Sequence, residues 1–87
     1  MRTKKVTVLT KNGLHMRVAG RIIDKSNQSR SKIVIRKGQI SADARSIIDL
    51  LMLAVTEGSE IEITVDGSDE EKTLRDLEAV LINGAGI

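Results

Sequence analysis

The sequence contains no cysteine, no proline and no Phe, Tyr or Trp, and it has a single histidine. Without cysteine, a disulfide framework, a thiolate metal site and a redox-active thiol are all excluded. One histidine cannot build a metal cluster by itself, so we expect neither a metal nor another cofactor. Small domains usually hold single-stranded nucleic acid by stacking its bases on aromatic side chains. Since these are missing, we expect no nucleic-acid partner.

The chain also lacks a long apolar run. The longest one, residues 50–55, is far shorter than the roughly 18 residues that a membrane helix needs. The basic start is followed by a segment of only four residues, 6–9, before polar residues interrupt it, which is too short for the apolar region of a secretory signal. With 87 residues, 40% of them hydrophobic and 30% charged, the composition is typical of one globular domain over residues 1–87. We expect it in the cytoplasm and away from membranes.

Charge is unevenly distributed, although the formal net charge is only +2. Residues 1–45 carry twelve Lys and Arg against two acidic residues, whereas residues 46–87 carry two against ten. The basic first half favours an acidic partner or a phosphate group. The competing interpretation is that the two halves interleave in the fold and that most of these charges are simply solvated.

Hydrophobic periodicity predicts four elements in the first half. A β-branched run predicts a strand over residues 6–9, and apolar residues at helical spacing predict an amphipathic helix over residues 16–27. Residues 33–35 and 40–44 predict two strands of a hairpin with Gly38 in its turn.

The second half begins with a short apolar helix over residues 47–53. Ser46 and Asp49 fit a capping box, in which Ser46 caps this helix and the Asp49 side chain reaches back. Strict alternation of apolar and polar residues then predicts a half-buried strand over residues 60–66.

A last helix starts after Ser68 or Asp69, either of which can cap it, and ends at the Asn-Gly pair of residues 83–84. Glu71 and Arg75 are spaced to form an i, i+4 ion pair on this helix. Its inner stripe consists of Leu74, Leu77 and Leu81.

These elements follow the order β-α-β-β-α-β-α. The central hairpin excludes an all-parallel sheet, and helices packed on one face of an antiparallel sheet are the economical arrangement. We therefore expect an α+β fold, an open-faced β-sandwich whose four-stranded antiparallel sheet is covered on one face by three helices.

His15 lies directly before the first predicted helix. The first turn of a helix presents unpaired N–H groups and the positive end of the helix dipole, which together attract anions. A ring nitrogen placed there can act as a nucleophile, and Arg17 can donate charge-assisted hydrogen bonds to an incoming phosphoryl group. On chemistry alone, the alternative is that His15 merely caps the helix and Arg17 lies on its surface.

Residues 13–19 (Gly-Leu-His-Met-Arg-Val-Ala) resemble the Gly-Leu/Ile-His-Ala-Arg-Pro-Ala signature of the HPr family, the histidine phosphocarriers of the bacterial phosphoenolpyruvate-dependent phosphotransferase system. The resemblance covers nearly the whole chain, including Ser46 with its apolar helix, the spacing to Gly58, and the strand and turn at residues 60–67. Residues 46–53 are most similar to the nitrogen-branch type called NPr, which serves regulation more than sugar uptake.

The resemblance implies a role for this site. Enzyme I, itself phosphorylated from phosphoenolpyruvate, would pass the phosphoryl group to Nδ1 of His15, and the carrier would hand it to an enzyme IIA protein. The backbone N–H groups of Met16, Arg17 and Val18 would hold the phosphoryl group, together with the Arg17 side chain. Such a carrier forms a transient phosphohistidine and makes no product of its own, so whether it is an enzyme stays open.

The resemblance also implies a surface on which partners dock. The sequence supports it, because the helix over residues 47–53 is apolar at nearly every position and cannot bury all of these side chains. Arg17, Arg21 and Lys25 would steer acidic partners. We expect a monomer that binds enzyme I and enzyme IIA proteins, with HPr kinase or regulatory proteins as further candidates. The expected docking residues are Met16, Gly20, Arg21, Ile47, Ile48 and Leu51.

Two residues depart from the signature. Val18 replaces the family's proline and so adds a backbone N–H, which would bond either to the unphosphorylated ring nitrogen or to the phosphoryl group. Met16 replaces alanine and puts a bulkier side chain beside the site. Both keep an alternative open, in which the chain is a regulatory protein-binding module with the HPr fold and impaired phosphotransfer.

Ser46 occupies a position that a dedicated kinase phosphorylates in many relatives from Gram-positive bacteria. A phosphate is electrostatically acceptable at a helix N-terminus. However, Asp49, where the family commonly has glycine, would repel it. A structural cap is the favoured interpretation of Ser46 and a regulatory phosphosite the alternative.

Overall fold

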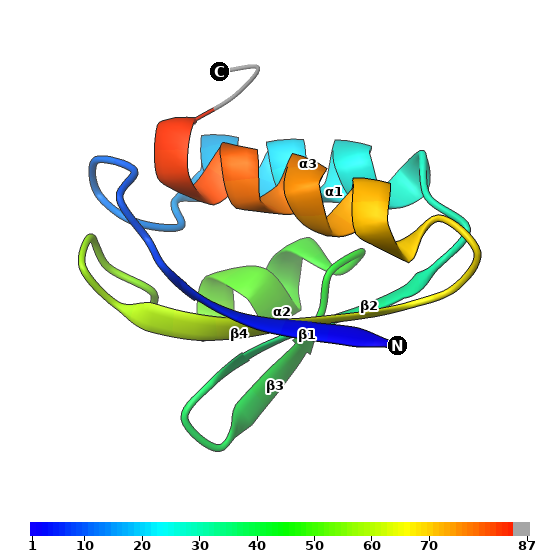
Figure 1. Ribbon diagram of the computed structural model, residues 1–87. Helices are drawn as coiled ribbons and strands as arrows, with labels where there is room; N and C mark the ends of the chain where they lie inside the picture. The colour runs from blue at the N-terminus through cyan, green and yellow to red at the C-terminus, as the bar shows by residue number, and fades with distance from the viewer. Residues whose placement is uncertain (85–87) are drawn as a thin grey trace.

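A computed structural model of the protein describes residues 1–84. Within this range, four strands and three helices follow one another in the predicted order β-α-β-β-α-β-α. Figure 1 shows α1 and α3 lying side by side above the sheet, with α2 at a lower level. The elements are β1 (Arg2–Thr7), α1 (Met16–Asn27), β2 (Lys32–Lys37), β3 (Ile40–Asp43), α2 (Ile47–Met52), β4 (Glu60–Asp66) and α3 (Glu70–Asn83).

The sheet has the strand order β1-β4-β2-β3, and every neighbouring pair is antiparallel. β4 is an inner strand, and its Ile63 stands opposite Lys4 of β1 on one side and Ile35 of β2 on the other. Gly38 adopts a positive φ of 60° in the β2–β3 hairpin. These pairings confirm the open-faced sandwich, with the helices on one face of the sheet.

The core lies between that face of the sheet and the helices. Buried residues alternate with more exposed ones along β2 and β4, so each strand buries one side. In β4 this follows the predicted alternation of apolar and polar residues. The predicted leucine stripe of α3 is buried as well. The largest buried side chains are Val8, Val18, Ile22, Ile33, Ile35, Leu50, Leu53, Ile61, Ile63, Val65, Leu77 and Leu81.

The first strand differs from its prediction over residues 6–9. β1 begins at Arg2, within a charged segment that carries no strand pattern, and ends at Thr7. It forms because it pairs with a strand from the other half of the chain, with Val6 opposite Ile61. Beyond Thr7 the chain leaves the sheet gradually, and the Val8 N–H still donates to the Ser59 carbonyl at 2.9 Å.

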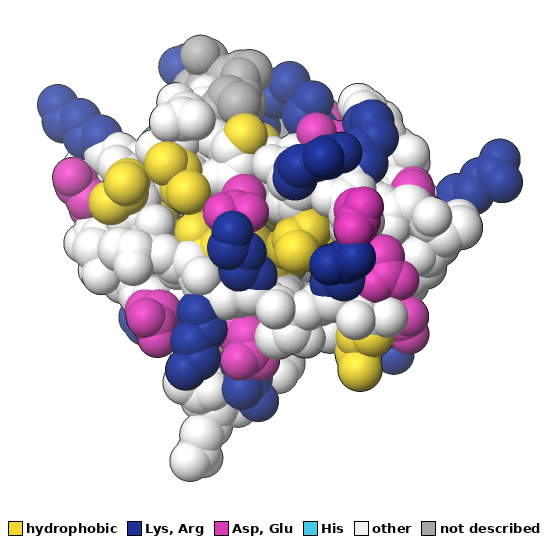
Figure 2. Space-filling view, in the orientation of Figure 1, with side chains coloured by type: hydrophobic (Ala, Val, Ile, Leu, Met, Phe, Trp, Pro, Cys, Tyr) yellow, Lys and Arg dark blue, Asp and Glu magenta, His cyan; other side chains and the backbone are white. Residues whose placement is uncertain are grey.

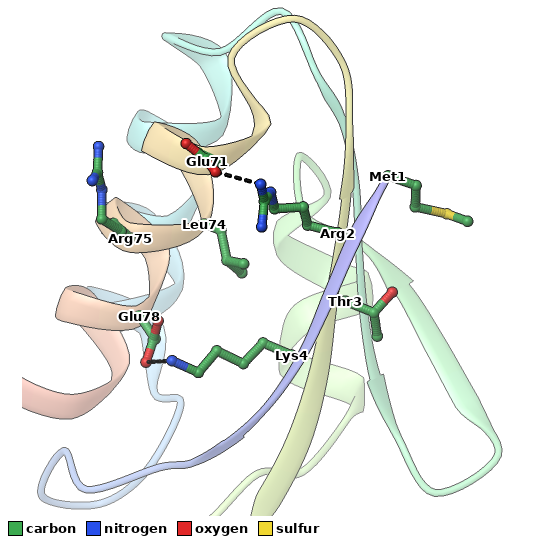
Figure 3. A pocket seen from close by; sticks show the side chains of 8 residues that line it. All are labelled: Met1, Arg2, Thr3, Lys4, Glu71, Leu74, Arg75 and Glu78. Carbon is green, nitrogen blue, oxygen red and sulfur yellow. Dashed lines mark hydrogen bonds and ion pairs between the residues drawn. The ribbon is translucent and has the colours of Figure 1, made fainter.

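Oppositely charged segments meet along β1 and α3, which brings the two halves of the sequence together. Arg2 pairs with Glu71, and the Lys4 ammonium lies 2.8 Å from Glu78 (Figure 3). The predicted Glu71–Arg75 pair is therefore wrong, because Glu71 turns toward β1 and Arg75 points away from it. Figure 2 shows the result, a surface on which acidic and basic side chains are interleaved.

The cap of α2 is only partly as predicted. The Ser46 hydroxyl accepts a hydrogen bond from the Asp49 N–H at 3.3 Å, which confirms Ser46 as the cap. The Asp49 carboxylate does not reach back to Ser46; it accepts from the Asp43 N–H at 3.3 Å. The Ser46 N–H is already satisfied by the Asp43 carbonyl at 3.0 Å, so the reciprocal half of a capping box has no donor to bind.

Asp69 occupies the cap position of α3, but its side chain makes no capping hydrogen bond. Its carboxylate crosses to the α1–β2 connection instead. There it accepts from the Ser31 hydroxyl at 2.5 Å, the Ser29 hydroxyl at 3.0 Å and the Arg30 N–H at 3.0 Å. The hydrogen bond from Ser31, followed by that from the Arg30 N–H, lowers the pKa of Asp69 from 3.8 to about 2. Asp69 thus ties two loops together.

Candidate functional site

His15 is the N-terminal cap of α1. Its backbone is extended, with φ −87° and ψ 179°, and Met16 is the first helical residue. The ring nitrogen Nδ1 accepts a hydrogen bond from the Arg17 N–H at 3.2 Å. The lone pair of Nδ1 therefore faces the free amides of the first helical turn, where partial positive charge accumulates.

A tightly bonded loop, residues 8–14, carries the chain from β1 to His15. One end is fixed to α3, since the N–H groups of Leu9 and Thr10 both donate to the Leu81 carbonyl, at 3.1 and 3.2 Å. The other end is fixed beside the α2–β4 connection, where the Leu14 N–H donates to the Val55 carbonyl at 3.1 Å. These contacts set the position of His15 before any partner arrives.

Within the loop, residues 10–13 form a closed turn. The Gly13 N–H donates to the Thr10 carbonyl at 2.9 Å, and the Thr10 hydroxyl returns a bond to the Gly13 carbonyl at 3.0 Å. Gly13 has a φ of +67°, and a Cβ on it would overlap the Val55 carbonyl and the Thr56 backbone. Only glycine fits this position, which explains the residue that opens the sequence motif.

The hydrogen bond at Nδ1 of His15 tests one of the two alternatives for the Val18 N–H, namely a bond to the ring nitrogen. Nδ1 accepts from Arg17 N–H, not from Val18 N–H, so the first alternative for Val18 is wrong. The reason is the geometry of the cap, which brings the second helical N–H closest to the ring. The second alternative, a hydrogen bond from the Val18 N–H to the phosphoryl group, stays a prediction. Within residues 1–84, the exposed Arg17 guanidinium forms no ion pair and is available.

The predicted docking residues lie on two helices that pack against each other, α1 and α2. Met16 is 64% exposed and Ile48 66%, whereas Leu51 is at 36% and Ile47 packs partly against the core. Met52, which is not among the predicted docking residues, is 71% exposed at the end of α2. We call Met16, Ile48, Leu51 and Met52 the exposed apolar face.

The two remaining docking candidates, Gly20 and Arg21, lie on α1. A Cβ added to Gly20 would meet no atom within 4 Å, so this part of the helix surface is open to close approach. Arg21 forms an ion pair with Asp24 at 3.4 Å, and its Nε is buried without a hydrogen-bond partner. An incoming acidic group would compete with Asp24 for this guanidinium.

Residues 1–84 contain neither a candidate metal site nor a membrane-spanning helix. No group of three or more His, Cys, Asp or Glu side chains is placed to hold a metal ion there. In the same range, no helix is both long and apolar enough to cross a membrane.

Comparison with known proteins decides the family. Residues 2–83 match the family described as "PTS HPr component phosphorylation site". The chain belongs to the HPr family. It is 35% identical over 81 residues to phosphocarrier protein HPr of Haemophilus influenzae, which covers 93% of this chain and 95% of that protein. It is 34% identical over 76 residues to the HPr-like protein Crh of Bacillus subtilis, covering 87% of this chain and 89% of that protein.

Solved structures agree with the fold as well. HPr from Bacillus anthracis superimposes with a TM-score of 0.88 at 38% identity, covering 92% of this chain and 95% of that one. HPr-C-His from Thermoanaerobacter tengcongensis gives a TM-score of 0.92 at 25% identity and covers 100% of this chain and 98% of that one. The resemblance seen at residues 13–19 is thus confirmed for the HPr family as a whole, whereas the NPr type stays a prediction.

One part of the site was not anticipated from the sequence. The end of α3, with Ile82, Asn83 and Gly84, lies beside His15 and helps to line a cavity there, together with Lys11 of the turn. No local signal connects these residues to His15, because only the folded topology brings the end of α3 to the start of α1.

Proposed function

We propose that this HPr-family chain is a phosphocarrier that receives a phosphoryl group on His15 from phosphorylated enzyme I and passes it to an enzyme IIA protein. The observation that carries the proposal is the position of Nδ1, held at the N-terminus of α1 by the Arg17 N–H. The cytoplasm, where phosphoenolpyruvate is available, is the compartment that this role requires. The route served is sugar uptake or its regulatory branch.

The transfer needs no cofactor. The Nδ1 lone pair of His15 forms a nitrogen–phosphorus bond while the bond from phosphorus to the donor breaks, and the electron pair of that bond stays with the donor. The Arg17 N–H, released from Nδ1, then joins the N–H groups of Met16 and Val18 around the phosphoryl oxygens. Transfer to the acceptor protein reverses these steps.

The strength of these interactions suits a carrier. A helix N-terminus stabilises an anion by roughly 0.3–1 kcal/mol, and a charged hydrogen bond from the Arg17 side chain adds roughly 1.5–3 kcal/mol. Together they hold the phosphoryl group without trapping it. Partners dock on the exposed apolar face. Its large apolar side chains are exposed in the free protein, and an exposed apolar patch usually marks an interaction site.

The test is phosphorylation from phosphoenolpyruvate by enzyme I of the same organism. We expect an acid-labile adduct of one phosphoryl group, seen by intact mass, that is absent from His15→Ala. Because His15 also caps α1, His15→Asn is the better variant, since asparagine keeps a cap and removes the nucleophile. An adduct that persists in His15→Asn would contradict the proposal.

The second candidate, a regulatory binding module with impaired phosphotransfer, is favoured by Met16, which stands 64% exposed next to His15. It requires that enzyme I bind the chain without phosphorylating it. The experiment above separates the two, provided that binding is measured alongside, by titration calorimetry. Met16→Ala is the informative variant, because it restores the residue of the family signature.

Ser46 enters the proposal as a structural cap. Its hydroxyl is engaged with the Asp49 N–H, and the Asp49 carboxylate lies on the same helix start, where it would oppose a phosphate. Intact mass after treatment with HPr kinase decides between cap and phosphosite. If Ser46 is phosphorylated, the phosphorylated fraction should be larger in Asp49→Gly, because this variant lacks the repelling carboxylate.

We also propose that the carrier works as a monomer, since one protomer supplies every residue named above. Relatives vary in this respect. One solved structure of Crh is described as a dimer with a swapped domain, and one solved structure of HPr from Thermoanaerobacter tengcongensis is described as a dimer. Light scattering coupled to size exclusion tests this, and a dimer at micromolar concentration would overturn it.

A further inference from the structure

The cavity beside His15 is lined in part by Lys11, a basic residue outside the signature motif. Its volume is about 330 Å³, which is ample for a phosphoryl group. His15 and Val18 line it from the start of α1, Lys11 lines it from the turn, and Asn83 and Gly84 line it from the end of α3. Arg17 is not among the lining residues, so the basic side chain that borders this space is Lys11.

The backbone holds Lys11 in place. It lies inside the closed turn of residues 10–13, in which Asn12 and Gly13 both have positive φ, 66° and 67°. The Thr10 N–H anchors this turn to the Leu81 carbonyl near the end of α3. Among residues 1–84, Lys11 has no ion pair and no side-chain hydrogen bond, so its ammonium is not engaged elsewhere.

A cation is needed on this side because of α3. The C-terminal end of a helix carries partial negative charge on its last carbonyl groups, and α3 ends at Asn83 on the wall of the cavity. A doubly charged phosphoryl group on His15 would be repelled from that wall. The Lys11 ammonium would offset this repulsion, and the Val18 N–H would attract the group at the start of α1.

We propose that Lys11 is a phosphoryl-binding residue, which holds the group on His15 in the cavity between α1 and the end of α3. This inference rests on the proposed function, since it presumes a phosphoryl group on Nδ1. It assigns the two cations different places: Lys11 contacts the bound group inside the cavity, and Arg17 meets it from the exposed side. The Val18 N–H binds the same phosphoryl group, so the effects of substitutions at Lys11 and Val18 should not be independent.

The test needs no partner protein. Phosphoramidate phosphorylates histidine directly: the Nδ1 lone pair forms the new bond to phosphorus and ammonia leaves. The phosphohistidine is then titrated by ³¹P NMR, and its rate of hydrolysis is followed by intact mass. The variants are Lys11→Gln, Lys11→Arg and, as a charge-matched control, Lys32→Gln, which lies beyond the opposite end of α1.

A nearby cation stabilises the doubly charged form of the phosphoryl group, so its loss should raise the pH midpoint of the ³¹P titration. We expect an increase of about half a pH unit in Lys11→Gln, which corresponds to about a threefold loss of preference for the doubly charged form, as for a solvent-exposed ion pair. Lys11→Arg and Lys32→Gln should retain the midpoint of the parent chain. In Lys11→Gln combined with Val18→Pro, the two shifts should not be additive, because both residues act on one group.

Several outcomes would overturn the inference. It fails if Lys11→Gln and Lys32→Gln give the same midpoint, or if Lys11→Arg behaves like Lys11→Gln. The proposed function fails separately, if enzyme I leaves the parent chain unphosphorylated or if the adduct persists in His15→Asn. Thermal unfolding of each variant checks the fold, and we expect no change for Lys11→Gln because the side chain is exposed.

Discussion

Replacing Gly13 by alanine should destabilise the protein far more than the same change at Gly38. Both glycines have a φ near +60°, so both variants pay the same backbone penalty of about 1 kcal/mol for a left-handed conformation. They differ in their surroundings. A Cβ at Gly38 meets nothing within 4 Å, whereas a Cβ at Gly13 overlaps the Val55 carbonyl.

The extra cost at Gly13 follows from the hydrogen bonds around it. To relieve the overlap, the turn must move away from Val55, which breaks the bond from the Leu14 N–H to the Val55 carbonyl and strains the one from the Gly13 N–H to Thr10. At about 1 kcal/mol for each bond, Gly13→Ala should lose about 3 kcal/mol of unfolding free energy and Gly38→Ala about 1 kcal/mol.

Urea denaturation followed by far-ultraviolet circular dichroism measures both values, since the chain has no Trp for fluorescence. Equal losses in the two variants, within about 0.5 kcal/mol, would refute the reasoning. Because the turn also positions His15, the folded Gly13→Ala protein should accept a phosphoryl group more slowly, whereas Gly38→Ala should not.

Three further predictions concern single features. The pKa of Asp69 is lowered in the folded state from 3.8 to about 2, so its contribution to stability is complete above about pH 5 and should be lost progressively as the pH falls toward 2. Asp69→Asn should flatten this part of the acid unfolding curve, and an unchanged curve would contradict the assignment. Ala54 has a φ of +52°, so Ala54→Gly should raise the unfolding free energy by about 0.5–1 kcal/mol in urea denaturation, and a loss of stability would show that the strain is absent. Oxidising the exposed Met16 and Met52 to sulfoxides with hydrogen peroxide should weaken partner binding by about 1 kcal/mol, measured by titration calorimetry, because it places a polar oxygen on the exposed apolar face. A variant with leucine at both positions should resist the treatment, and oxidation of Met1 alone, at 77% exposure, should have no effect.

Sequence reasoning succeeded where the information is local. The alternation in β4 and the periodicity of α1 predicted those elements to the residue, and His15 was correctly placed at a helix start. These features depend on patterns within one segment, so no knowledge of the fold was needed.

The errors share a different cause. β1 extends through charged residues because it pairs with β4, Glu71 turns to Arg2 across the groove shown in Figure 3, and Asp69 binds a loop near the end of α1 rather than its own helix. In each case the observed partner is distant in the sequence, so local patterns could not predict it. The same limitation concealed Lys11, whose relation to His15 depends on where α3 ends.

The unequal distribution of charge along the chain also influences how the protein folds. Before folding, the chain is an ampholyte whose cationic N-terminal half is attracted to its anionic C-terminal half. That attraction favours early encounters between the segments that later become β1 and β4, which come from the cationic and the anionic half of the sequence. Since 0.1 M salt screens such forces beyond about 10 Å, collapse should be fastest in dilute buffer, and the rate of refolding should fall as ionic strength increases.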